Sequence, residues 1–117
     1  MEKVFNKLVR DNIPQIIMDN NEKPYTRILS EEEYKIELEK KLYEEYQEML
    51  NASKEDRIEE LADMLEIIKC LAEIEGYSLD DVTRECDKKR LKRGSFKQKI
   101  FLEKTTDWGE LWDYLVK

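Results

Sequence analysis

Apolar side chains gather at helical spacing along much of the chain, and the polar residues between them predict where helices begin and end. A first helix should begin within residues 11–14, where an acidic or Asn cap and a first-turn proline suit a helix start, and end within residues 20–24. Ser30 followed by Glu33 is a capping box. This box predicts a second helix running to about Asn51.

The same signals predict two further helices. Ser53 with Asp56 repeats the cap pattern, and the helix it opens should end around Gly76, a typical C-terminal glycine. Ser78 should start a fourth helix that reaches roughly Leu91.

Beyond the break at Gly94 the pattern is shorter. Residues 25–29 and 96–102 are short segments of extended character, and a two-stranded β-ribbon between them is one option. Residues 108–116 predict a last helix, whose apolar face must cover either the domain or a partner subunit. Residues 105–117 are therefore expected to pack on the domain or on that partner.

Composition favours an all-α bundle of four to five helices. Three glycines and two prolines leave little material for the turns of an all-β fold. A chain of 117 residues is the size of one domain with one core. The 42% of charged residues and 40% of hydrophobic residues indicate strongly two-faced helices.

Charge and cysteine content narrow the class of protein. A net charge of −7 disfavours binding to nucleic-acid polymers and to anionic membranes. No stretch approaches the roughly 20 apolar residues of a membrane span, and the first residues do not resemble a signal peptide, so we expect a cytoplasmic protein. Cys70 and Cys86 lie in predicted helices and are expected to be reduced thiols.

The chain contains no histidine, which removes Ser-His-Asp and Cys-His catalysis and the His-containing zinc and di-iron sites. The catalytic chemistry that the composition still allows uses carboxylates, lysine or a metal ion.

Two pairs of acids occupy apolar helix faces. On a helical wheel Glu45 falls in the middle of the sector formed by Leu38, Leu42 and Met49, and Glu48 lies one turn further at its edge. The third helix has its polar stripe at Glu55, Glu59, Glu66 and Glu73. Glu60 and Asp63 lie on the other side, with Met64, Ile67, Leu71 and Ile74.

Such placement calls for a positive partner. Burying an ionised carboxylate costs roughly several kcal/mol, and four such groups placed close together would repel one another. Lys, Arg or a hard divalent cation are the candidates, and an all-oxygen cluster suits Mg²⁺ or Mn²⁺. Each acid taken alone is more simply an ordinary solvated helix residue, whereas two pairs on consecutive helices favour the metal.

The motifs E-E-x-x-E at residues 44–48 and E-x-x-D at 60–63 resemble the signature of the all-α nucleotide pyrophosphohydrolases. This superfamily is MazG-like and includes phosphoribosyl-ATP pyrophosphohydrolase. The start K-L-V-R-D-N-I-P at residues 7–14 and R-G-S-F at 93–96 resemble one branch of house-cleaning enzymes. Together they cover most of residues 4–104, which defines a MazG-like domain over residues 1–104.

The resemblance implies a bundle in which Glu45, Glu48, Glu60 and Asp63 bind Mg²⁺, with Mn²⁺ as an alternative. Glu44 faces away from Glu45 on the wheel and has a weaker claim. The implied reaction cuts a nucleoside triphosphate between the α and β phosphates, releasing NMP and pyrophosphate, in the house-cleaning of non-standard nucleotides. Related bundles form homodimers or higher homo-oligomers. The alternative is a non-catalytic, nucleotide-binding or regulatory helical dimer.

Roles within that reaction follow from the same resemblance. Glu45 or Glu48 would orient or deprotonate the attacking water. Lys89 and Arg93 match family positions that contact substrate, although basic residues at a helix end also favour the helix dipole. Lys7, Arg10 and Asp11 are substrate-binding candidates as well, and their basic members would clamp phosphate or pair with nearby acids.

Overall fold

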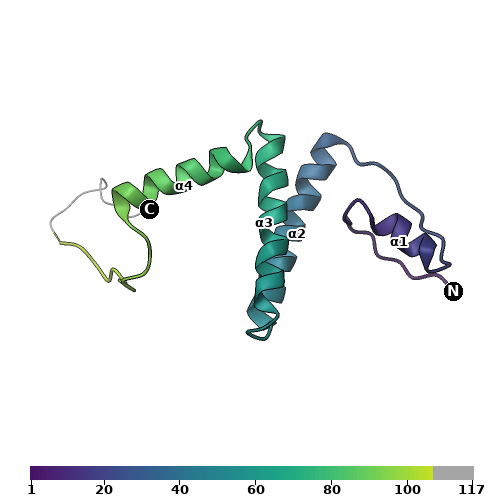
Figure 1. The fold of residues 1–117 in the computed structure, drawn as a ribbon, viewed down its shortest axis with the longest axis horizontal. Helices are drawn as coiled ribbons and strands as arrows, with labels where there is room; N and C mark the ends of the chain where they lie inside the picture. The colour runs from purple at the N-terminus through teal and green to yellow at the C-terminus, as the bar shows by residue number, and fades with distance from the viewer. Residues whose placement is uncertain (107–117) are drawn as a thin grey trace. The chain divides into compact units, whose positions relative to one another are not determined.

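The computed structural model describes residues 1–106 of the chain, and every regular element within them is a helix (Figure 1). In chain order the helices are α1 (Ile13–Asp19), α2 (Glu31–Asn51), α3 (Arg57–Ile74) and α4 (Leu79–Arg93). The all-α class is confirmed. The chain divides into two compact units, Met1–Arg84, which holds α1 to α3, and Glu85–Lys117. The helix expected over residues 108–116 lies outside the described residues.

The helix starts follow the capping chemistry of the sequence. At α2 the Ser30 hydroxyl accepts a hydrogen bond from the Glu33 backbone N–H at 3.2 Å, and the Glu33 carboxylate accepts one from the Ser30 N–H at 3.3 Å. Ser78 and Asp81 make the same reciprocal pair ahead of α4, at 2.8 and 3.2 Å. Both predicted starts are confirmed.

The start of α3 differs from the expectation. Ser53 and Asp56 are hydrogen bonded as predicted, but they close a turn, and the helix itself begins at Arg57. The end of α3 agrees with the prediction: Gly76 adopts a φ of +85°, and the Tyr77 N–H donates to the Ala72 carbonyl at 2.9 Å. These features close the helix in the manner of a Schellman motif.

The expected β-ribbon is wrong, because residues 1–106 contain no strand. Residues 25–29 have no regular structure, and Phe96 begins a turn in which its carbonyl accepts from the Lys99 N–H at 3.1 Å. A two-stranded ribbon is marginal without a face to pack on. The β-favouring residues of these segments therefore do not determine their structure.

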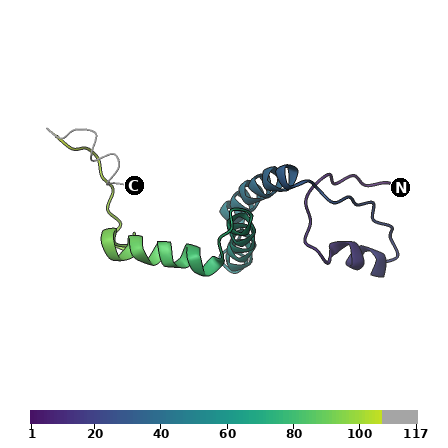
Figure 2. The same ribbon diagram turned by 90° about the horizontal axis from the view of Figure 1, so that it is seen from above.

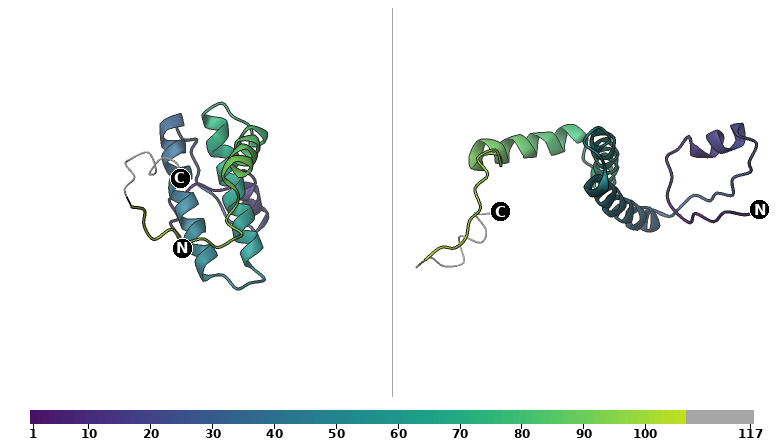
Figure 3. Two further views of the ribbon diagram at one scale, coloured as in Figure 1. Left: turned by 90° about the vertical axis from the view of Figure 1, so that its left-hand side faces the viewer. Right: turned by 90° about the horizontal axis from the view of Figure 1, so that it is seen from below.

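α2 and α3 form an antiparallel hairpin, and among the described helices they are the pair that pack on each other. Figure 2 shows the pair nearly end-on, and the left view of Figure 3 shows the two helices side by side with the connection of residues 52–56 at one end. Leu38 of α2 and Ile67 of α3 are the buried apolar residues among those described, and Glu45 is buried with them. The hairpin thus carries an acid in its small core.

The other face of α3 is apolar and exposed. Ile58, Leu61 and Leu65 recur at spacings of three and four residues on that face.

None of the helices described within residues 1–106 is long and apolar enough to span a bilayer.

Candidate metal centre

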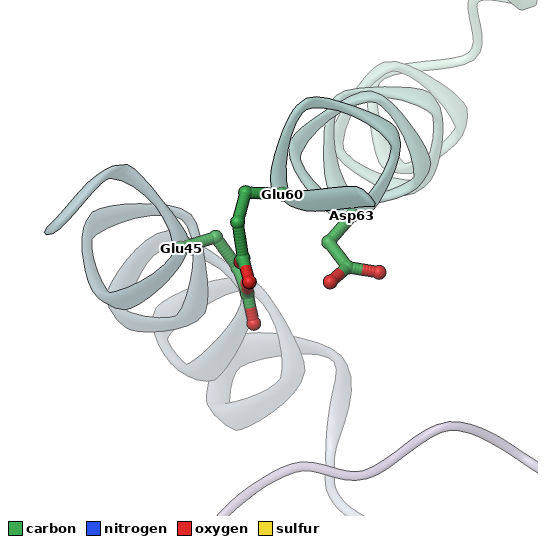
Figure 4. Close-up of side chains that lie close together, drawn as sticks. All are labelled: Glu45, Glu60 and Asp63. Carbon is green, nitrogen blue, oxygen red and sulfur yellow. The ribbon is translucent and has the colours of Figure 1, made fainter. Parts of the chain in front are cut away.

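Three carboxylates from the two helices of the hairpin converge on one point. Glu45 precedes the end of α2 by less than two turns, and Glu60 and Asp63 lie in the first two turns of α3. An antiparallel pair with a short connection places these positions opposite each other. One oxygen from each side chain lies within 4.8 Å of the others, and Figure 4 shows the carboxylates of Glu45 and Glu60 close together with Asp63 beside them.

Glu45 is the most deeply placed of the three acids. It is only 8% exposed, whereas Glu60 and Asp63 are half-buried. The Oε2 atoms of Glu45 and Glu60 are both buried without a hydrogen-bond partner. Unpartnered buried oxygens are rare in folded proteins because each forfeits its hydration. The hairpin therefore holds a polar centre whose own residues leave it incompletely satisfied.

The electrostatics of Glu45 reflect this arrangement. Burial is the main cause that raises its pKa, and with hydrogen bonding to the Glu60 carboxyl and the negative charges of Glu48 and Asp63 the pKa reaches about 7. Two carboxyls hydrogen bond to each other only when one of them holds a proton. The surroundings of Glu45 therefore favour its protonated form.

Glu48, the fourth acid predicted to bind metal, is exposed and lies outside this group of three. It lines an open groove at the loop end of the hairpin, together with Glu44, Gln47, Asn51, Ala52, Asp56, Glu59 and Glu60. Its charge still acts on the pKa of Glu45. The wheel had placed Glu48 at the edge of the apolar sector, and its exposure agrees with that position.

The N-terminal candidates are distributed differently. Arg10 reaches the centre: its Nη2 donates to Asp63 Oδ1 at 2.7 Å. Lys7 and Asp11 are exposed in the same segment. Burial, Cys70 and Glu73, and then Asp11, raise the pKa of the Tyr34 hydroxyl to about 12.

Lys89 and Arg93 lie one turn apart on the exposed last part of α4, in the second unit of the chain. Their spacing places both on one side of that helix. Their predicted role in substrate binding stays a prediction.

One polar cluster has no counterpart in the sequence analysis. The Cys70 thiol donates to Glu66 Oε2 at 3.6 Å, and burial raises its pKa. A half-buried thiol with a raised pKa is a poor nucleophile. The signal that would have located the contact is the four-residue spacing of Glu66 and Cys70 along α3.

Comparison with known proteins adds no relative. The chain matches no family model, no curated protein and no solved structure.

Proposed function

We propose that this protein is a Mg²⁺-dependent nucleoside triphosphate pyrophosphohydrolase that releases NMP and pyrophosphate. The observation that carries the proposal is the buried Glu45 carboxylate, whose Oε2 has no hydrogen-bond partner and which lies beside Glu60 and Asp63. The position of the cut and the house-cleaning role rest on the resemblance of residues 44–48, 60–63 and 7–14 to the MazG-like enzymes. We place the activity in the cytoplasm, where nucleoside triphosphates and Mg²⁺ are abundant.

The residues present fit a hard divalent cation. All three groups offer carboxylate oxygens, the ligands that Mg²⁺ and Mn²⁺ prefer, and two of those oxygens lack any other partner. Glu45, Glu60 and Asp63 would hold the ion, and Glu48 lines the adjoining groove together with Glu60. A bound cation would supply charge neutralisation on the phosphate oxygens and lower the pKa of a water molecule.

The side chains of this chain supply the remaining functions. Glu45, buried beside Glu60 and Asp63, would orient or deprotonate the attacking water through a carboxylate oxygen that the ion does not use. Glu48, exposed on the groove, is the alternative base. Arg10 is close enough to the acids to bind a phosphate group there, and Lys7 lies three residues before it.

Incubation with a panel of standard, damaged and modified nucleotides in Mg²⁺ tests the proposal. We expect NMP and pyrophosphate as products, and strong loss of turnover in Glu45→Gln and Asp63→Asn. Glu39→Gln is the matched control, because Glu39 is exposed on the same helix and does not line the groove. Turnover that survives both substitutions, or release of orthophosphate in place of pyrophosphate, would refute the assignment.

We also propose that the hairpin pairs with that of a second copy. α3 exposes Ile58, Leu61 and Leu65, and α2 exposes Tyr43 and Leu50. A two-helix layer with so small a buried core needs a second layer, and another α2–α3 hairpin would complete a four-helix bundle. Light scattering at micromolar concentration should give at least twice the monomer mass, and Leu61→Lys with Leu65→Lys should lower it. A monomer would exclude this assembly.

A nucleotide-binding helical dimer without catalysis is the second candidate, favoured by the same exposed apolar face of α3. Tight nucleotide binding without any product over long incubation would support it over the enzyme.

A further inference from the structure

A long-range ion pair connects the N-terminal segment to the acidic centre. Arg10 Nη2 lies 2.7 Å from Asp63 Oδ1, across a separation of 53 residues. Neither Glu45 nor Glu60 forms an ion pair among the described residues, so Arg10 is the cation paired with this group of acids there. Its charge neutralises part of the repulsion within the centre.

The pair is built so that it can open. The side chains of Arg10 and Asp63 are 58% and 39% exposed, and exposed ion pairs contribute little to stability. The Arg10 carbonyl accepts from the Ile13 N–H at 3.0 Å, which fixes its backbone to the start of α1. The backbone of Arg10 is therefore fixed while its side chain can move, and breaking the ion pair with Asp63 costs little free energy.

A guanidinium and a divalent cation compete for the same negative charge. A cation held by Glu45, Glu60 and Asp63 would lie close to the Asp63 carboxylate that Arg10 now contacts. The guanidinium and the cation are both positive and would repel each other at so short a distance. Arg10 cannot keep its present contact without weakening the binding of the ion.

We propose that Arg10 is a counter-charge for Asp63 in the absence of a divalent cation, and that it releases Asp63 when the cation binds and turns to the phosphate groups of the substrate. This inference rests on the proposed cation site. Arg10 would then contact the substrate itself, and its release would link metal binding to recognition of the triphosphate.

Calorimetric titration of the full chain with Mn²⁺ alone, at a pH above the pKa of Glu45, tests the competition. Arg10→Gln should bind Mn²⁺ about two- to fivefold more tightly than the wild type, the range expected for an exposed ion pair. Arg10→Lys, which keeps the charge, should stay close to the wild type. Arg27→Gln is the matched control, because Arg27 also forms an exposed ion pair, with Glu33 at 3.1 Å, and neither residue belongs to the group of three acids.

The second half of the inference predicts the opposite sign. With Mn²⁺ present, inorganic tripolyphosphate should bind Arg10→Gln about tenfold more weakly than wild type, the loss expected for a charge-assisted hydrogen bond. A merely structural Arg10 would move both affinities in the same direction or neither.

Each remaining outcome overturns a defined part of the inference. Equal or weaker Mn²⁺ binding by Arg10→Gln would exclude the competition, and unchanged tripolyphosphate binding would exclude the transfer to phosphate. Absence of Mn²⁺ binding in all variants would remove the cation site itself. These results do not depend on turnover, so Mn²⁺ binding without any nucleotide cleavage would overturn only the proposed reaction.

Discussion

Replacement of Glu45 by Gln should stabilise the protein at pH 8 in the presence of a chelator. Glu45 is 8% exposed, its Oε2 has no hydrogen-bond partner, and burial is the main cause of its raised pKa. An amide of the same shape carries no charge to desolvate. The substitution removes the repulsion with Glu60 and Asp63 while it keeps the side-chain volume.

The raised pKa gives the size of the effect and its pH window. The folded protein binds the Glu45 proton more tightly than the unfolded chain does, so the free energy of unfolding falls as pH rises from 4.5 to about 7 and is level above. One pKa unit is worth about 1.4 kcal/mol, so the wild type should lose about 3 kcal/mol across this window. That is a large part of the stability of a small domain.

Urea unfolding of wild type, Glu45→Gln and the control Glu44→Gln, at pH 5 and pH 8 with chelator, measures this directly. The wild type and Glu44→Gln should lose stability between the two pH values, and Glu45→Gln should not. Mg²⁺ added at pH 8 should restore the unfolding free energy of the wild type and leave that of Glu45→Gln nearly unchanged, because a ligand stabilises only the protein that binds it. A Glu45→Gln protein less stable than the wild type at pH 8 would refute the reasoning.

Three further outcomes are expected. Asp63→Asn should weaken Mn²⁺ binding by at least about tenfold in a calorimetric titration, and unaltered binding would remove Asp63 from the ligand set. Ser30→Ala deletes the acceptor of the Glu33 N–H and should cost about 1 kcal/mol in urea unfolding, whereas a stable variant would mean that the box adds nothing to α2. Gly76→Ala should cost about 1–2 kcal/mol of unfolding free energy, because a φ of +85° is unfavourable for alanine. No atom lies within 4 Å of an added Cβ, so a steric clash contributes nothing, and a smaller loss would show that the backbone relaxes.

Local signals in the sequence predicted most of the helices. The Ser30 and Ser78 boxes and the glycine at Gly76 satisfy backbone groups within a few residues, so their effect can be read without knowledge of the fold. The start of α3 was placed too early because the Ser53–Asp56 pair also fits a turn. Residues 96–102 were misjudged because the structure of short apolar segments depends on what they pack against.

The candidate site was predicted in part. The wheel located Glu45, Glu60 and Asp63, since a carboxylate in an apolar sector is visible as a break in periodicity, and the structure brings these three together. The contact of Arg10 with Asp63 spans 53 residues and leaves no periodic trace. Its partner could be named only once the path of the N-terminal segment was known.

The nearness of the three acids in the sequence has a kinetic consequence. Contacts between positions 45 and 60 form as soon as a short hairpin closes, and such local closure is an early and fast event in folding. If this closure is part of the folding transition state, the cost of burying the Glu45 charge slows folding, and we expect pH to change the folding rate more than the unfolding rate. Protons or divalent cations that are present while α2 and α3 come together would therefore speed folding. The same ions added after folding would not.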